Sequence, residues 1–169
     1  MTYSIYTDGG CSGNKNGSGC IGAHAFVIVD EEGWSVTSGD YGAYDTTNNK
    51  QEIMGAVAGL ERLMVVLEGK GVDPKSVTCS IVTDSKYLSD NYTNCLPQWK
   101  EKGWVKFSGR PLLNLDYWKK LDEAASKIGE VKFRWVKGHD GNRYNETADR
   151  LVKTRIAITK QQQQTSRWS

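Results

Sequence analysis

The chain has 169 residues, of which 38% are hydrophobic and 25% are charged, and its formal net charge is +2. This composition is typical of one folded domain, and it excludes a disordered chain or one that is basic over its whole surface. No apolar run reaches the ~18 residues that cross a bilayer and the first residues lack a signal peptide, so we expect a cytoplasmic protein without membrane contact.

The first half of the chain predicts three strands and a long helix. Strand-forming residues cover 4–8, and the Gly- and Asn-rich segment 9–22 predicts a turn or hairpin connection. Segments 23–29 and 34–41, joined by a turn at 30–33, complete an antiparallel meander. From residue 48 to about residue 68, apolar side chains recur at the spacing of an amphipathic helix, with Thr46 and Thr47 as candidate N-caps.

The second half alternates strands and helices, which indicates an α/β domain with a mixed sheet. Strands are predicted at 77–82 and 130–136, and helices at 86–91, 116–128 and 146–158. Segments 97–115 and 138–145 are expected to be irregular. We expect a single domain over 1–159, and a disordered tail over 160–169 because that segment is polar and contains four consecutive glutamines.

Four acidic residues fall at the ends of these elements. Asp8 and Asp84 end strands, whereas Glu52 and Asp149 lie in the first turns of helices. If the two strands are parallel neighbours, the carboxylates meet at one edge of the sheet, where ligand sites of α/β proteins collect. Taken singly, each acid is also explained as a turn former, a cap or a complement to a helix dipole. Taken together, they would repel one another, and Mg²⁺ would relieve that repulsion.

The residues around these acids resemble a known family. TDGGCSGN at 7–14, TTNNKQE at 46–52, VTDSKY at 82–87 and WVKGH at 135–139, followed by Asn145, Glu146, Ala148 and Asp149, resemble in order and spacing the motifs of type 1 ribonucleases H. The resemblance covers residues 3 to about 155 and is to bacterial-type members that carry a basic protrusion. It implies the RNase H-like fold, an α/β fold with a five-stranded mixed sheet in the order 3-2-1-4-5 and helices on both faces.

The resemblance also implies an activity, namely endonucleolytic hydrolysis of the RNA strand of RNA–DNA hybrids. Two Mg²⁺ ions, for which Mn²⁺ is expected to substitute, would support in-line attack and leave 5′-phosphate and 3′-hydroxyl ends. Asp8 would bridge both ions, Asp149 would complete the ion that activates water, and Glu52 and Asp84 would complete the other. His139 would assist proton movement or product release.

A hybrid-specific nuclease must recognise the 2′-hydroxyl groups of one strand and their absence from the other. The resemblance places a set of residues at the RNA minor groove: Gly9, Gly10, Cys11, Ser12, Asn14, Asn48, Glu52 and Lys86. Asn14 and Thr47 would also hold a DNA phosphate, Asn49 would face the DNA strand, and Asn145 is a further candidate substrate residue. Lys86 departs from the family, in which glutamine is common at this position.

Residues 95–115, called the handle below, resemble the basic protrusion of bacterial-type members. The segment from 98 to 120 interleaves aromatic and basic residues, which suits phosphate neutralisation beside stacking, although core packing explains the tryptophans equally well. We expect Trp104 at the groove of the substrate, Trp118 mainly in the core, and a weaker DNA contact at Cys95, where many members have an aromatic residue. The substrate-binding candidates of the handle are Trp99, Lys100, Lys102, Trp104 and Lys106.

Two other functions remain open at this point. One is a DNA nuclease of the same fold, such as a resolvase or an integrase, and the other is a hybrid-binding module without catalysis. The RNA–DNA hybrid is the expected partner, and we expect a monomer that needs no protein partner. The cysteines lack the CxxC spacing of zinc sites and are expected to be free thiols: Cys11, Cys20, Cys79 and Cys95.

Overall fold

The computed structural model describes residues 1–13, 20–106 and 108–166. The elements of the first half are β1 (Thr2–Ser12), β2 (Ile21–Asp30), β3 (Ser35–Tyr44) and α1 (Asn48–Lys70). Those of the second half are a 3-10 turn η1 (Pro74–Ser76), β4 (Thr78–Thr83), α2 (Lys86–Asp90), a π-helical segment η2 (Asn91–Cys95), α3 (Leu96–Glu101), α4 (Leu115–Ser126), β5 (Glu130–Trp135) and α5 (Arg143–Ser166).

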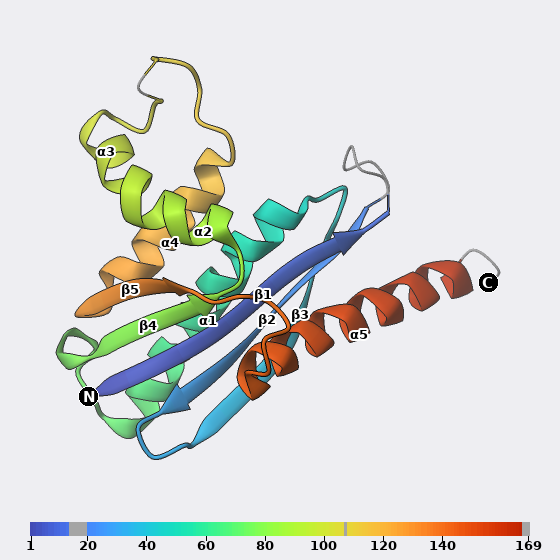
Figure 1. Cartoon of the computed structure of the whole chain (residues 1–169), viewed down its shortest axis with the longest axis horizontal. Coiled ribbons are helices and arrows are strands. Elements are labelled where there is room, and N and C mark those ends of the chain that lie inside the picture. The colour runs from blue at the N-terminus through green and yellow to red at the C-terminus, as the bar shows by residue number, and fades with distance from the viewer. Residues whose placement is uncertain (14–19, 107, 167–169) are drawn as a thin grey trace.

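The five strands form one sheet in the order β3-β2-β1-β4-β5, which confirms the predicted order (Figure 1). Strand β1 is antiparallel to β2 and parallel to β4, and β4 is in turn parallel to β5. The parallel pairing ends with Thr7 of β1 opposite Thr83 of β4. Asp8 and Asp84, which follow these two positions, therefore lie side by side at the point where β4 ends, while β1 continues to Ser12.

Helices cover both faces of the sheet, as predicted. On one face, α1 and α4 enclose the main core, in which the side chains of Ile5, Ile53, Leu60 and Trp118 are fully buried. Each such side chain contributes about 1.5–3 kcal/mol through its removal from water. On the other face, Val152 of α5 packs on alanines of β2. The two hydrophobic layers hold the sheet rigidly between the helices.

Helix α1 lies close to β1 because the residues between their backbones are glycines, which have no side chain to hold the two elements apart. A Cβ atom at Gly9 would lie 2.3 Å from the carbonyl carbon of Gln51, and one at Gly55 would lie 2.9 Å from the carbonyl oxygen of Asp8. The start of α1 is fixed by Thr47, whose hydroxyl oxygen accepts a hydrogen bond from the Lys50 N–H at 3.2 Å, as the N-cap prediction requires. This close approach brings the first turns of α1 against the end of β1.

Two predicted boundaries are wrong. A turn was expected from residue 9 onward, but β1 continues to Ser12 and pairs with β2 along this length. The tail expected to be disordered from residue 160 instead continues α5 as far as Ser166. Lys and Gln are good helix formers, so a polar composition did not prevent helix propagation here. Figure 1 shows the C-terminal half of α5 extending past the sheet.

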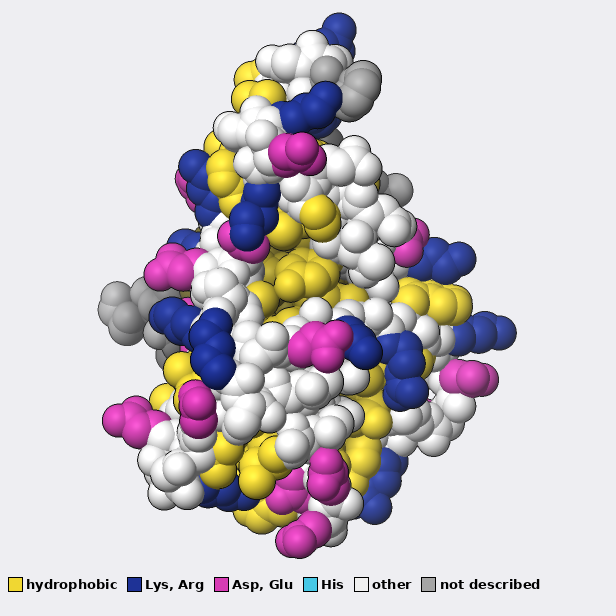
Figure 2. Space-filling view, turned by 90° about the vertical axis from the view of Figure 1, so that its left-hand side faces the viewer, with side chains coloured by type: hydrophobic (Ala, Val, Ile, Leu, Met, Phe, Trp, Pro, Cys, Tyr) yellow, Lys and Arg dark blue, Asp and Glu magenta, His cyan; other side chains and the backbone are white. Residues whose placement is uncertain are grey.

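The handle projects from the rest of the molecule between α2 and α4 (Figure 1). Part of the segment expected to be irregular is helical, as α3, and an isolated antiparallel bridge joins Val105 to Pro111. Trp118 is completely buried, which confirms its predicted place in the core. Trp104 is partly buried against that core and has a left-handed backbone conformation with φ of 68°. Figure 2 shows Lys and Arg side chains on the projecting part of this face.

The described residues contain no helix with the length and apolar character that crossing a membrane requires. All four cysteines are free, as predicted.

Candidate active site

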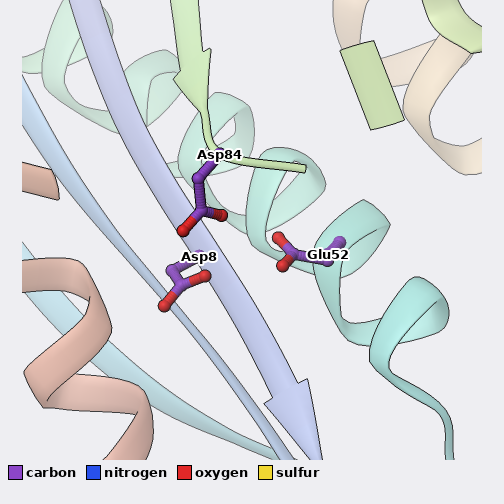
Figure 3. Close-up of side chains that lie close together, drawn as sticks. All are labelled: Asp8, Glu52 and Asp84. Atoms are coloured by element: carbon purple, nitrogen blue, oxygen red, sulfur yellow. The ribbon is translucent and has the colours of Figure 1, made fainter. Parts of the chain in front are cut away.

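Three of the four predicted acids meet at one edge of the sheet. Asp8 lies on β1, Asp84 directly follows β4, and Glu52 points toward both from α1 (Figure 3). One carboxylate oxygen of each residue lies within 4.8 Å of the others. The parallel pairing of β1 with β4 accounts for the two aspartates, and the close approach of α1 to β1 accounts for the glutamate.

Asp149 joins this cluster from α5, on the opposite face of the sheet. Its carboxyl group lies close enough to that of Asp8 to raise the pKa of Asp8, after the larger effects of burial and of Asp84. The Nζ atom of Lys153, one helical turn further along, lies 3.0 Å from Asp149 Oδ2. The four acids that sequence analysis singled out are therefore neighbours in space.

Burial and mutual repulsion disfavour the charged forms of these groups. Burial raises the pKa of Asp8 to about 8, with additional contributions from the charges of Asp84 and Asp149. The pKa of Glu52 is raised well above its usual value by burial and by the nearby Asp8 and Asp84. The pKa of Asp84 is raised by burial first and then by Asp149. A pKa of about 8 favours the protonated form of Asp8 at neutral pH, and a bound cation would favour the ionised form instead.

The donor set fits a hard divalent cation. All candidate ligand atoms are carboxylate oxygens, which Mg²⁺ prefers over nitrogen or sulfur ligands. Within the described part of the chain, Glu52 Oε2 is buried and has no hydrogen-bond partner. An unpartnered buried oxygen is costly, and a bound cation would satisfy it. Asp8, Glu52, Asp84 and Asp149 are thus the residues that could hold metal ions.

A cavity of about 680 Å³ opens beside the acids. The backbone N–H of Cys11 donates a hydrogen bond of 2.6 Å to Asn48 Oδ1, which joins β1 to the start of α1 at this wall. Asn14, also predicted to bind substrate, lies outside the described residues. The predicted substrate residues that line the cavity are Gly9, Gly10, Cys11, Ser12, Asn48, Asn49 and Glu52.

The loop that follows β5 places His139 near the cluster. A Cβ atom at Gly138 would lie 3.0 Å from Asp84 Oδ2, and His139, the next residue, is near enough to interact electrostatically with Asp84. The Trp135 indole N–H donates a hydrogen bond of 2.9 Å to the Asp84 carbonyl oxygen. The Lys86 ammonium lies 4.7 Å from the centre of the Trp135 ring. The loop, β5 and the start of α2 therefore support one side of the acidic cluster.

Other predicted substrate residues have structural contacts of their own. The Trp99 ring lies edge-on to Trp118 with centroids 5.5 Å apart, and Lys100 forms an ion pair with Asp122 at 3.1 Å. Asn145 is buried near the start of α5, and its Oδ1 has no hydrogen-bond partner among the described residues. Three candidates lie exposed at the surface: Thr47, Lys102 and Lys106.

Sequence analysis did not identify two basic residues of α5 at the cavity. Lys153 and Lys160 both line it, together with Val152 and Ile156. Lys153 lies inside the helix predicted at 146–158, one turn after Asp149, and that spacing could have identified it, whereas Lys160 lies beyond the predicted end of this helix. Gln51 was also missed: its amide donates to Thr46 Oγ1 at 3.0 Å and its carbonyl oxygen lies 2.9 Å from His24 Nδ1.

Comparison with known proteins identifies the family. The family model described as RNase H matches residues 1–157. Ribonuclease H of Pseudomonas paraeruginosa is 36% identical over 153 residues, which cover 90% of this chain and 92% of that protein. Ribonuclease HI of Pseudomonas aeruginosa is 35% identical over the same shares of the two chains. The crystal structure of LC11-RNase H1 in complex with RNA/DNA hybrid has the same fold, with a TM-score of 0.68, 23% identity, and coverage of 93% of this chain and 98% of that one. The chain therefore belongs to the RNase H family, and its relatives include type 1 enzymes.

Proposed function

We propose that this protein is an endonuclease that hydrolyses the RNA strand of RNA–DNA hybrids. The observation that carries the proposal is the meeting of Asp8, Glu52 and Asp84 oxygens within 4.8 Å of one another in a member of the RNase H family. The cavity beside them is lined on one side by the backbone of residues 9–12 and by Asn48, and on the other by α5 with Lys153 and Lys160, and these hydrogen-bonding and basic groups suit a nucleic-acid strand.

Mg²⁺, with Mn²⁺ as a substitute, fits this donor set. Two such ions held by Asp8, Glu52, Asp84 and Asp149 would activate water and neutralise charge on the phosphate that is attacked. Asp8 would take part in holding both ions, a role supported by its neighbours, which include all three other acids. His139 would move a proton or assist product release, and its electrostatic interaction with Asp84 supports this role. The expected ends are a 5′-phosphate and a 3′-hydroxyl.

Different residues at and beside the cavity would contact the RNA strand and the DNA strand of the hybrid. Residues 9–12 and Asn48 adjoin the acids, so we propose that they, with Asn14 and Lys86, face the RNA minor groove and its 2′-hydroxyls. Thr47 and Asn49, at the start of α1, would then contact the DNA strand, with Asn145 as a further substrate residue. LC11-RNase H1, which shares the fold, was solved with an RNA/DNA hybrid.

The handle would bind the DNA strand further from the acids. Lys102 and Lys106 are exposed there, and Lys119 lies 5.8 Å from the centre of the Trp104 ring, so positive charge surrounds an accessible aromatic surface. Trp99 and Lys100 would act mainly by holding the handle on α4 through their contacts with Trp118 and Asp122. We propose a monomeric enzyme, since one chain supplies all four acids.

A substrate panel tests the proposed function. We expect cleavage of RNA in a labelled RNA–DNA hybrid with Mg²⁺ or Mn²⁺, no cleavage in EDTA, and no cleavage of duplex DNA or duplex RNA. Gel analysis of the products should show 5′-phosphate and 3′-hydroxyl ends. Cutting of four-way DNA junctions with the hybrid left intact would favour a resolvase-like enzyme, and hybrid binding without any cutting would favour a binding module.

A further inference from the structure

One face of α5 forms a wall of the cavity from the acidic cluster outward. Asp149, Val152, Lys153, Ile156 and Lys160 all line the cavity. Each of them lies three or four residues from another member of the set, which places them on one face of a helix. At a rise of 1.5 Å per residue, the wall extends for about 16 Å between the first and last of these residues. The substrate cavity is therefore longer than the acidic cluster alone.

The two lysines of this wall have different surroundings. The Lys153 ammonium lies 3.0 Å from Asp149, so its charge is balanced within the acidic cluster. Lys160 instead donates a hydrogen bond to the uncharged Ser12 hydroxyl, and within the described ranges no carboxylate lies at ion-pair distance from it. Lys160 is exposed at the outer end of the cavity. Lys160 therefore supplies a positive charge at this end of the cavity, and no described carboxylate forms an ion pair with it.

Both ends of the Lys160–Ser12 contact are held in place. Val152 packs on the alanines of β2, and the Arg155 guanidinium donates a hydrogen bond of 3.3 Å to the Gly39 carbonyl oxygen of β3. Ser12 is the last residue of β1 and is paired with Ile21 of β2. The helix backbone that carries Lys160 is therefore anchored on the sheet, and the Lys160 side chain reaches residues 9–12 through its contact with Ser12.

We propose that Lys160 binds a backbone phosphate of the hybrid, away from the bond that is cut, and so lengthens the substrate site along α5. The proposal rests on the proposed function, because that function places one phosphate at the acids. A strand that continues along the cavity brings its next phosphates past the same helix face, where the exposed ammonium of Lys160 attracts them. Lys160 is a positioning residue and takes no part in the chemical step.

The test compares Lys160→Gln with wild-type enzyme in steady-state cleavage of a hybrid at several salt concentrations. We expect KM to rise about two- to tenfold and kcat to stay within about twofold, since one phosphate contact is lost. The slope of log(kcat/KM) against log[salt] should become shallower by about one. Lys160→Arg, which keeps the charge, should restore most of the affinity.

Lys70→Gln is the matched control, because Lys70 ends α1 and lies 3.9 Å from Asp30, away from the cavity. It should leave KM and the salt slope unchanged. An unchanged KM and salt slope in Lys160→Gln would overturn the proposal, and so would a lower Tm with no change in slope, since that result describes a purely structural contact. Either result leaves the proposed function standing, whereas failure of the wild-type enzyme to cut any hybrid removes both.

Discussion

Replacement of Asp8 by asparagine is expected to lower the rate of hybrid cleavage by about 10⁴-fold or more, because residues that act as one catalytic unit fail together. Asp8 is the acid whose neighbours include Glu52, Asp84 and Asp149, so its loss affects every metal position that the cluster could form. Asparagine has nearly the same shape and leaves the fold unchanged. Single-turnover cleavage of a labelled hybrid with Mg²⁺ measures the effect.

Hybrid binding by the same variant should stay close to that of the wild type when measured in EDTA. The substitution removes a negative charge from a surface that meets a polyanion, so it gives no reason for weaker binding. Asp116→Asn is the control, because Asp116 is an exposed residue of α4 outside the cluster, and it should leave cleavage within about twofold of wild type. If Asp8→Asn retained a tenth of the activity, Asp8 would have no central role in catalysis.

In EDTA, the free energy of unfolding is expected to fall as the pH rises from about 4 to about 8, through the contribution of the acidic cluster. Burial and neighbouring charges raise the pKa of Asp8 to about 8, so the folded protein binds this proton more tightly than the unfolded chain does. The stabilisation is complete below the unfolded pKa and is lost as the pH rises through the folded one. Glu52 and Asp84 act in the same direction.

Urea denaturation at pH 5, 6, 7 and 8 in EDTA measures this dependence. Asp8→Asn should weaken it, and at pH 8 the variant should be more stable than wild type by about 1–3 kcal/mol, given about 1.4 kcal/mol for each pKa unit. The Asp116→Asn control should follow the wild-type profile. A wild-type stability that rises across this range to the same extent as that of Asp8→Asn would show that the acids do not repel one another in the folded protein.

The position of the acidic cluster could be predicted from the sequence because strand order determines it. Asp8 and Asp84 each follow a run of strand formers, and the carboxyl ends of parallel neighbours lie on the same side of a sheet. The length of β1 could not be predicted, since the Gly-rich residues after Asp8 favour a turn on their own. Pairing with β2 and the close packing of α1 on Gly9 outweigh that preference.

The full length of α5 was missed because composition and helix propensity indicate different structures for its last turns. A glutamine-rich segment is typical of disorder, yet Gln also has a high helix propensity, and the contact between Lys160 and Ser12 ties the extension to β1.

For the handle, the pattern of tryptophans and lysines does not show which of these residues pack in the core and which are free to bind substrate. Only the structure shows that Trp99 contacts Trp118 whereas Lys102 and Lys106 stay exposed.

Calorimetric titration with Mn²⁺ at pH 7, in two buffers of different ionisation enthalpy, counts the protons that leave the protein as the ion binds. Because the pKa of Asp8 is raised to about 8, dication binding should release protons from the wild-type protein, and Asp8→Asn should release fewer and bind Mn²⁺ more weakly. Binding without proton release, or with equal release from Asp8→Asn, would contradict the account in which four mutually repelling carboxyl groups form a metal-dependent nuclease site.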